Sequence, residues 1–370
     1  MKLLHIASGR LFGGIERMLV TLAASDAVAG LRHQFAVCCE SRLALELRAE
    51  GAPVHSLGDV RLRRPATIIA ARRRLAALLA EQRPDVVICH APWAHAVCGP
   101  TVRSTSRPLA MWLHDAFDGR SIVDRWARRT PADLVIANST WTAGRAQPLG
   151  SALPIAVVPC PIGVTASTAN RAAMRTACDT PAEQLVVLIA SRLQSWKGHL
   201  TLIGALAEVN RTRRDWTLWI AGGAQRPEER AYATRLQSRA RELGISDRLR
   251  LIGERSDIPD VMRAADLLCQ PNEAPEPFGV VFVEALACGL PVVAVRDGGA
   301  ADVLNDRCAR FVEARDTHGL ARVLDRLMTR PDERAAMARA GVDRAALFAP
   351  EIVLPTLRDA LRPLMARAAA

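Results

Sequence analysis

The chain has 370 residues, of which 50% are hydrophobic and 24% charged, so it is long enough for two domains and is neither disordered nor low in complexity. No apolar run reaches the roughly 18–20 residues that a membrane span needs. The net charge of +11 suits an anionic substrate, an anionic membrane surface or nucleic acid, although a simple preference for arginine would produce it as well.

The first half of the chain alternates short β-branched runs with amphipathic stretches. The N-terminus is apolar only over residues 1–7 and then runs into Gly9, so we predict a first strand there and not a signal peptide. Helices are predicted at Ile15–Ala27 and Ala66–Gln82. The predicted strands are Leu3–Ser8, Gln34–Cys39, Val54–Leu57, Asp85–His90, Leu109–His114, Leu134–Asn138 and Ile155–Val158.

The alternation breaks at Pro159–Val164, where two prolines and a glycine predict a linker. A second alternating series follows, and the tail 331–368 is predicted to be helical with a break at Pro350. The predicted strands of this half are Leu185–Ala190, Thr217–Ala221, Leu249–Ile252, Leu267–Gln270, Val292–Val295 and Arg310–Val312. Its predicted helices cover residues 198–210, 227–244, 278–288 and 317–329.

Apolar strands separated by helices predict parallel sheets that are covered on both faces. We therefore expect an α/β protein of two doubly wound, Rossmann-like domains, with boundaries at 1–163 and 164–348 and a final helix at 349–370. Ligands of such sheets bind beyond the carboxyl ends of the strands, so the site is expected in a central cleft that the two domains face.

Nine cysteines are scattered along the chain, an odd number, and no Cys-x-x-Cys spacing occurs. Most of them lie in apolar strand or helix contexts. This pattern favours buried, reduced thiols in a cytosolic protein over disulfides or a zinc site.

The strongest group of candidate site residues follows the strand Leu267–Gln270. A polar loop leads into a helix predicted to begin near Phe278 and Gly279, whose free first-turn amides and positive dipole end would bind an anion such as a diphosphate. Glu276 lies just before this end of the helix. Glu284 lies inside an otherwise apolar helix, so it needs a partner, which could be a ligand or a buried arginine.

A second group follows the strand Leu185–Ala190. Arg192 and Lys197 lie five residues apart in the next loop, where one could bind each side of a diphosphate, or both could belong to a solvated basic loop. Lysine occurs only at Lys2 and Lys197 among 49 basic residues, which indicates that a compact point charge is needed at Lys197.

Two weaker groups lie in the first half. Gly13 and Gly14 stand between the first strand and the first helix, but their spacing is not the dinucleotide fingerprint, and they could form only a tight turn.

Histidines close two neighbouring predicted strands at His90 and His114, and Asp115 follows. Both imidazoles would point toward the same cleft, which favours a functional role, although a histidine at a strand end is often structural. A metal site of His90, His95 and His114 is an alternative that lacks a visible carboxylate partner.

A basic amphipathic stretch covers Arg61–Arg74, where six arginines surround isoleucines and leucines. It could be an ordinary surface helix of an arginine-rich protein. The alternative is an interfacial helix that contacts anionic lipid.

These pieces together resemble the retaining glycosyltransferases of the large GT-B family 4, over nearly the whole chain. The most specific part is the Glu-x7-Glu motif from Glu276 to Glu284, which continues through Gly289 and Gly298-Gly299. An Arg-Leu-x-x-x-Lys-Gly loop with Arg192 and Lys197, and a Gly-Gly-x-Glu-Arg start at residues 13–17, match in the expected order. Where the family usually has a glutamate after the second glycine pair, this chain has Asp302, which puts fine positioning in doubt.

The resemblance implies a role for each matching residue. Glu276 would face the transferred sugar, Glu284 would hold the ribose hydroxyls, and His114 would contact the sugar or phosphate. Arg192 and Lys197 would clamp the diphosphate and offset its charge as it leaves. The donor-binding residues it implies are Gly14, Arg192, Lys197, Gly253, Phe278, Gly279 and Glu284. The residues it implies on the acceptor side are Gly13, His90 and Asp115.

The function implied is retaining transfer of a sugar from a nucleotide-sugar to a hydroxyl acceptor, in cell-envelope, lipopolysaccharide or exopolysaccharide synthesis. No metal or other cofactor is expected, and no dedicated general base is evident. The expected location is cytoplasmic, with possible contact to the inner face of the membrane. The alternatives are a nucleotide-sugar epimerase or phosphorylase of the same fold, and a basic nucleic-acid-binding protein. Few aromatic residues (4%) are present for base stacking, which argues against the last class.

Overall fold

The computed structural model describes residues 1–150, 152–163 and 170–368. The chain divides into two compact units. Unit 1 comprises Met1–Gly163 with Phe348–Ala370, and unit 2 comprises Val164–Leu347. Val164, which ends the predicted linker and begins the predicted second domain, lies outside the described residues, as do residues 369 and 370 of the predicted final helix.

Unit 1 contains a seven-stranded parallel sheet in the order β3-β2-β1-β4-β5-β6-β7. The order reverses between β1 and β4, so these two neighbours form the switch point of a doubly wound sheet. The strands are β1 (Lys2–Ala7), β2 (Arg32–Val37), β3 (Val54–Ser56), β4 (Val86–His90), β5 (Leu109–Leu113), β6 (Leu134–Ala137) and β7 (Ile155–Val157).

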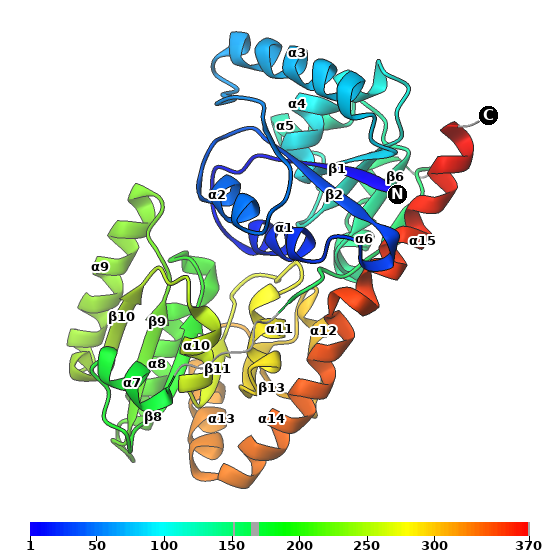
Figure 1. Ribbon diagram of the computed structural model, residues 1–370. Coiled ribbons are helices and arrows are strands. Elements are labelled where there is room, and N and C mark those ends of the chain that lie inside the picture. Colours follow the sequence, from blue (N-terminus) through cyan, green and yellow to red (C-terminus); the bar gives the residue numbers. More distant parts are fainter. Residues whose placement is uncertain (151, 164–169, 369–370) are drawn as a thin grey trace. The chain divides into compact units, whose positions relative to one another are not determined.

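Helices cover both faces of this sheet. One face packs Leu4 and Ile6 of β1 against Leu75 and Leu79 of α3 and against α4. On the other side of β1 and β2 lies α1, and α15 contacts β4 (Figure 1). The helices of unit 1 are α1 (Gly14–Ala24), α2 (Arg42–Ala49), α3 (Pro65–Gln82), α4 (Ala91–Arg103), α5 (Ile122–Ala127), α6 (Thr140–Gly144) and α15 (Pro350–Ala368).

Unit 2 contains a six-stranded parallel sheet in the order β10-β9-β8-β11-β12-β13. Its switch point lies between β8 and β11, because consecutive strands move away from these two neighbours in opposite directions. The strands are β8 (Leu185–Ala190), β9 (Trp216–Ala221), β10 (Leu249–Gly253), β11 (Leu267–Gln270), β12 (Val292–Val295) and β13 (Ala309–Val312).

The core of unit 2 joins this sheet to three helices on one face, where Val187, Ile220 and Leu267 pack against α8, α9 and α13. Contacts between α7 and α10, and between α10 and α11, form a second helical layer. The helices of unit 2 are α7 (Arg171–Ala177), α8 (His199–Val209), α9 (Pro227–Glu242), α10 (Ile258–Ala264), α11 (Val280–Ala287), α12 (Ala300–Val303), α13 (Thr317–Thr329) and α14 (Pro331–Ala345).

The two predicted doubly wound α/β domains are thus confirmed, with small differences at helix ends. The helix predicted to reach Ala27 stops at Ala24, because Ala27 adopts a left-handed conformation with φ of +71° that no helix can continue through. The helix predicted to begin near Phe278 begins at Val280, since Gly279 has φ of +90° and is its N-cap. Pro350 breaks the tail as predicted and is the first residue of α15.

Within the described part of the chain, no helix combines the length and the apolar character needed to cross a bilayer. All nine cysteines are free thiols, and all except Cys39 and Cys288 are buried. The buried thiols agree with the prediction made from the apolar contexts of the cysteines.

Candidate active site

Two loops meet at the switch point of unit 2, one after β8 and one after β11. Because β8 and β11 are neighbours, the loop that carries Arg192 and Lys197 lies beside the loop that carries Glu276. The backbone N–H of Glu273 donates to the carbonyl of Trp196 at 2.7 Å. Gly198 has φ of +77°, and a Cβ there would lie 1.9 Å from the carbonyl oxygen of Pro271. Only glycine therefore allows this close contact between the loops.

Lys197 and Glu276 form an ion pair between these loops. Lys197 Nζ lies 2.6 Å from Glu276 Oε2, and each side chain is only 13% exposed. Asn272 Nδ2 donates to the same oxygen at 2.7 Å, and Gln270 Nε2 donates to Asn272 Oδ1 at 3.3 Å. The ammonium group also lies 3.9 Å from the ring centroid of Trp196. Both buried charges are thus compensated and fixed by neighbouring polar groups.

The backbone of Glu276 is held by the glycine pair that follows β12. Gly299 N–H donates to Glu276 O at 2.6 Å, and Glu276 forms a parallel bridge with Gly298. Gly298 has φ of +70°, and a Cβ on it would lie 2.3 Å from Glu276 O. Asp302, which replaces the family's usual glutamate, lies in the first turn of α12.

Arg192, the second predicted cation, lies near a different carboxylate. Its Nη1 is 3.8 Å from Oε1 of Glu229, which is 2% exposed. The other oxygen of Glu229 accepts from the backbone N–H groups of Gln225 at 2.7 Å and Arg226 at 3.2 Å, at the start of α9. The Arg192 side chain remains 33% exposed. It is therefore anchored by charge while its guanidinium can still reach a ligand.

The N-terminus of α11 follows directly after the carboxylate loop. Among the described residues no side chain caps it, and a Cβ on Gly279 would collide with the ring of Phe282. Phe278 is buried. Glu284, in the same helix, is buried at 8% exposure and takes part in an interaction, as its apolar surroundings required.

Gly253 is the last residue of β10 and has φ of +73°. It is connected to the loop after β8 by contacts of Gly222. Its carbonyl accepts from Gly222 N–H at 2.8 Å. A Cβ on Gly222 would lie 1.8 Å from the carbonyl oxygen of Ser191. Gly253 thus supports the backbone of the loop that carries Arg192.

In unit 1, the loop after β1 leads into α1 through the double glycine. Gly13 is the N-cap of α1, and its backbone N–H donates to Glu16 Oε2 at 3.0 Å. Gly14 is the first helical residue. The pair is therefore the start of a helix at the sheet's switch point, and more than a tight turn.

The two histidines predicted at strand ends contact each other. His90 Nδ1 and His114 Nε2 lie 3.0 Å apart, and both side chains are buried. Burial lowers the pKa of His114 to about 3 and holds the pKa of His90 well below its usual value, so both imidazoles are neutral at physiological pH. Asp115 is exposed, and its Oδ1 accepts from the backbone N–H of Ala116 at 2.7 Å.

His95 does not join these two histidines. It lies on α4, and its Nε2 is 2.8 Å from the carbonyl oxygen of Thr130. Over residues 1–150, 152–163 and 170–368, no group of three or more histidine, cysteine, aspartate or glutamate residues is arranged to hold a metal ion. His95 is thus placed apart from His90 and His114, which the alternative of a shared metal site would have joined.

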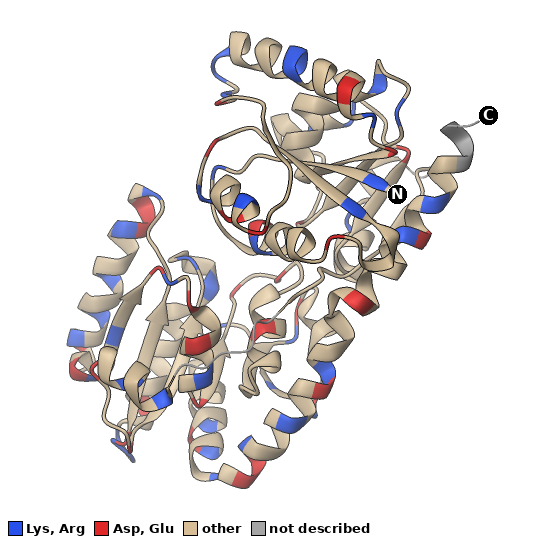
Figure 2. Cartoon of the chain, viewed as in Figure 1, with Lys and Arg blue, Asp and Glu red and all other residues tan. Residues whose placement is uncertain are grey.

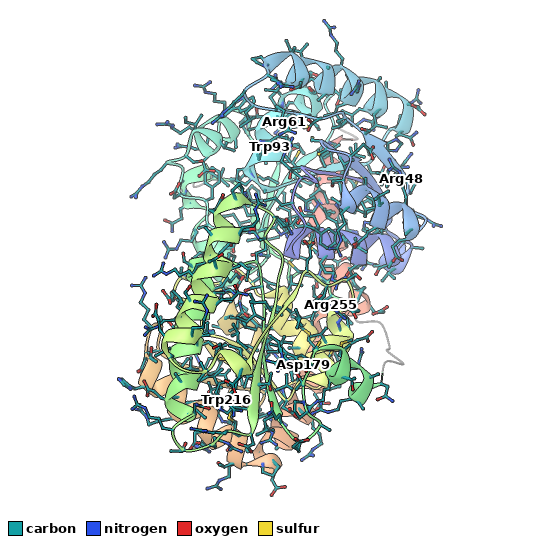
Figure 3. The ribbon with its side chains drawn as sticks, turned by 90° about the vertical axis from the view of Figure 1, so that its left-hand side faces the viewer. Arg48, Arg61, Trp93, Asp179, Trp216 and Arg255 are labelled. Carbon is teal, nitrogen blue, oxygen red and sulfur yellow. The ribbon has the colours of Figure 1, made fainter. Side chains whose placement is uncertain are left out.

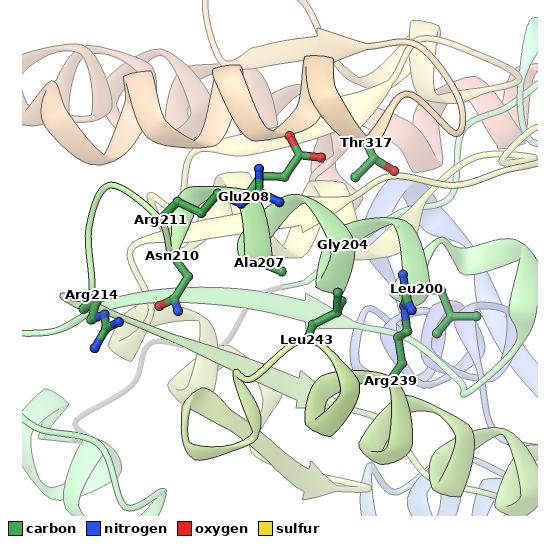
Figure 4. Close-up of a pocket in the computed structure, with 10 residues that line it drawn as sticks. All are labelled: Leu200, Gly204, Ala207, Glu208, Asn210, Arg211, Arg214, Arg239, Leu243 and Thr317. Atoms are coloured by element: carbon green, nitrogen blue, oxygen red, sulfur yellow. The ribbon is translucent and has the colours of Figure 1, made fainter.

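A separate hollow of about 430 Å³ lies between α8 and α9 (Figure 4). Arg211, Arg214 and Arg239 are among its lining residues, and none of the residues that line it belongs to the predicted site. Arg214 lies just before β9, so this part of the hollow is at the opposite edge of the sheet from the two loops.

The basic stretch Arg61–Arg74 covers the turn before α3 and the N-terminal part of that helix, and basic positions occur on many other helices as well (Figure 2). Its apolar residues Leu75, Leu78 and Leu79 pack into the core of unit 1. Arg61, labelled in Figure 3, pairs with Asp59. The helix thus uses its apolar face within unit 1.

Family models match both halves of the chain. Residues 12–165 match the model described as Glycosyltransferase Family 4, and residues 170–344 match the model described as Glycosyl transferases group 1. With two parallel, doubly wound sheets, the fold is that of the GT-B class. The chain belongs to glycosyltransferase family 4.

Similar proteins have been characterised to different extents. The D-inositol 3-phosphate glycosyltransferase of Saccharomonospora viridis is 33% identical over 250 residues, which cover 64% of this chain and 56% of that protein. The chain thus spans about half the length of the curated relatives it matches. The crystal structure of Anabaena HepE with UDP and glucose is 25% identical, covers 99% of this chain and 100% of that one, and has a TM-score of 0.85. HepE with UDP-glucose gives 26% identity, the same coverage and the same TM-score.

Several residues of this arrangement were not singled out from the sequence. Asn272 had a usable signal, because it lies in the same polar loop as Glu276 and only four residues before it. Glu229 had none, since it follows Arg192 by 37 positions and lies on α9, whereas Arg192 lies in the loop after β8. Gly222 could have been recognised as a glycine directly after a strand, where close backbone contact is common.

Proposed function

We propose that this chain is a retaining glycosyltransferase that moves a sugar from a nucleoside diphosphate sugar to a hydroxyl acceptor. The observation that carries the proposal is the Lys197–Glu276 pair at the switch point of unit 2, within loops fixed together by Gly198 and Gly298. Ligands of doubly wound sheets bind at such a point. Membership of family 4 supports the same class of reaction.

The diphosphate of the donor would bind to Arg192, Lys197 and the N-terminus of α11. An ammonium group has three N–H donors, and Glu276 accepts only one of them, so Lys197 can also donate to a phosphate oxygen. Helix N-termini attract anions through their free N–H groups and dipole. The complex of HepE with UDP-glucose supports a uridine nucleotide as the first candidate donor.

The sugar would lie next to Glu276. Lys197 and Asn272 both donate to Oε2 of its carboxylate, so the oxygen Oε1 takes no part in these two hydrogen bonds. Glu284 is proposed to bind the ribose hydroxyls. His114 is proposed to contact the sugar as a neutral imidazole. On the same reasoning, the backbone of Gly14 would complete the phosphate site, and Gly13, His90 and Asp115 belong to the acceptor side.

We propose that transfer needs no metal ion, because Arg192, Lys197 and the helix end supply positive charge where the diphosphate leaves. The acceptor proton would pass to the leaving phosphate in a same-face substitution, so no separate base is required. Addition of EDTA is then expected to leave the rate of transfer unchanged. A loss of activity that Mg²⁺ or Mn²⁺ restores would contradict metal independence.

The acceptor proposed is a saccharide or lipid-linked saccharide of cell-envelope synthesis, reached at the inner face of the membrane. The support is the segment from Arg61 to Arg74, at and before the start of α3. There the side chains of Arg63, Arg64 and Arg73 make no hydrogen bond or ion pair within the described residues, and Ile69 is 54% exposed. Co-sedimentation with anionic but not neutral vesicles is expected. Equal binding to both would remove this part of the proposal.

The proposed function is tested by following nucleotide release from a panel of UDP- and GDP-sugars, with and without saccharide acceptors. Release that depends on an acceptor is expected, which separates transfer from epimerisation. Glu276→Gln should abolish most of it, whereas the matched Glu228→Gln, at a glutamate that is 68% exposed, should not. Near-wild-type turnover in Glu276→Gln would exclude the assigned site.

A further inference from the structure

Four histidines form a continuous hydrogen-bonded chain across four neighbouring strands of unit 1. His33 of β2 places Nδ1 2.9 Å from Nε2 of His5 in β1. His5 Nδ1 lies 2.9 Å from Nε2 of His90 in β4, and His90 Nδ1 lies 3.0 Å from Nε2 of His114 after β5. The three links therefore all join Nδ1 of one ring to Nε2 of the next.

Packing fixes the angles between these rings. His90 and His114 are inclined by 15°, His5 and His33 by 30°, and His5 and His90 by 33°. Phe35 stacks on His5 at 5.3 Å, and Trp112 stacks on both His90 and His114. The aromatic neighbours prevent the imidazoles from rotating away, so each nitrogen keeps its partner.

All four rings are buried and neutral. Their exposed fractions are 0% for His5, 2% for His33, 3% for His90 and 8% for His114. Burial lowers the pKa of His33 to about 4 and that of His114 to about 3, and it holds the pKa values of His5 and His90 well below the usual value. A neutral imidazole has one N–H donor and one acceptor nitrogen.

This geometry couples the tautomers. If one ring carries its proton on Nε2, each neighbour must do so as well, because otherwise two donors or two acceptors would face each other. The histidine chain thus has only two arrangements in which all three links are hydrogen bonds. In one, His114 Nδ1 accepts and His33 Nε2 donates; in the other, the roles reverse. These two end atoms are buried and have no hydrogen-bond partner within the described residues.

We propose that His33, His5 and His90 are positioning residues for His114: the four rings change tautomer as one unit, so the histidine chain sets whether Nδ1 of His114 donates or accepts a hydrogen bond. In this change His114 Nδ1 takes up a proton from water, each ring passes its Nε2 proton to Nδ1 of the next ring, and His33 Nε2 releases a proton to water; the reverse change returns every proton. A ligand hydroxyl can accept or donate a hydrogen bond. The tautomer change of the histidine chain lets His114 match either case without rotation of its ring. Assigning that ligand as the transferred sugar rests on the proposed function, whereas the coupling of tautomers does not.

The coupling is tested by nuclear magnetic resonance of the full chain with ¹⁵N-labelled histidine, since ¹⁵N shifts distinguish protonated from unprotonated ring nitrogens. The chain has eight histidines, and single His→Phe variants assign the signals. We expect the same nitrogen, Nδ1 or Nε2, to be protonated in all four rings. Opposite tautomers in two neighbouring rings would overturn the proposal.

Variants that remove one histidine test whether the coupling extends along the histidine chain to His114. His5→Phe keeps a ring beside Phe35 but removes two links, so the tautomer populations of His114 should change although His5 does not touch it. Unchanged His114 shifts would contradict the coupling. His33→Phe removes only the end link and provides the same test if His5→Phe fails to fold. His95→Phe, a buried histidine outside the chain, is the matched control and should leave His114 unaffected.

The link to the sugar is measured by calorimetric titration with UDP-glucose. His5→Phe should weaken binding by about 3- to 10-fold, the equivalent of one hydrogen bond, with no effect of His95→Phe. Equal binding by His5→Phe and wild type would remove the positioning role. If wild type does not bind UDP-glucose although its four tautomers agree, the donor assignment fails and the coupled chain stands.

Discussion

The two sheets present different chemistry at the same topological place. At the carboxyl edge of unit 2, Lys197 pairs with Glu276 and Arg192 lies near Glu229, so each cation has a carboxylate beside it. At the corresponding edge of unit 1, His90 and His114 are buried, hydrogen-bond to neighbouring imidazoles and are neutral. One edge can therefore offset a diphosphate, whereas the other offers hydrogen bonds suited to hydroxyl groups.

The largest effect is expected from removing charge at the edge of unit 2. Lys197→Ala should lower the rate of nucleotide release by about 100- to 1,000-fold, as when one group that stabilises a leaving oxyanion is lost. Lys197→Arg should recover only part of the rate, because a planar guanidinium replaces a compact ammonium.

The control for this comparison is Arg226→Ala, an arginine in the same unit whose side chain is 48% exposed. It should leave the rate within about twofold of wild type, as surface substitutions usually do. If Arg226→Ala and Lys197→Ala reduce the rate equally, the rate depends on the overall positive charge of unit 2 and not on the Lys197–Glu276 pair.

The next effect concerns the contact between the two loops. Gly198→Ala should destabilise the chain by about 2–4 kcal/mol, because the new Cβ would lie 1.9 Å from Pro271 O at a left-handed φ of +77°. Gly244→Ala is the matched control, with φ of +69° and no atom within 4 Å of the added Cβ, and should cost only about 1 kcal/mol. Urea unfolding measures both, and equal losses would show that the loops can separate without cost.

The smallest effect is a difference in acid sensitivity. Six histidines in unit 1 have pKa values lowered mainly by burial, and in unit 2 burial lowers the pKa of His199. In the unfolded chain these histidines take up protons at about pH 6.5, whereas in the folded chain burial keeps them neutral. Their contribution to the free energy of unfolding is therefore complete above about pH 6.5 and falls as the pH decreases toward 4. Each fully buried group contributes up to about 1.4 kcal/mol per pH unit.

Hydrogen exchange between pH 7 and pH 5, corrected for intrinsic rates, measures this difference strand by strand. Protection should fall more in β1 and β4 than in β8 and β11. Equal losses in both sheets would indicate that the imidazoles of unit 1 are not held neutral by folding.

The sequence predicted the strands well because each is a short, continuous apolar run that a parallel sheet buries on both faces. It missed α4, whose Gly99 and Pro100 are poor helix formers and which is stabilised by packing on β4 and β5. Short helices such as α7 and α10 also lack enough turns to show a period.

The candidate site was predictable where its residues form a local motif. Lys197 and Glu276 each follow an apolar strand, and their loops meet because β8 and β11 are neighbours. The histidine chain was only half visible: His5 and His33 lie inside strands and meet partners 85 and 28 residues away. Contacts of that kind depend on strand order, which no local spacing encodes.

The central claim is that the carboxyl edge of the unit 2 sheet, with Lys197 and Arg192, binds a nucleoside diphosphate. Calorimetric titration of UDP and GDP into wild type and Lys197→Ala tests this claim most directly. At least one nucleotide should bind wild type, and its Kd should rise at least about tenfold in Lys197→Ala, or about 1.4 kcal/mol, but not in Arg226→Ala. Binding of neither nucleotide, or equal affinity in wild type and Lys197→Ala, would contradict the claim.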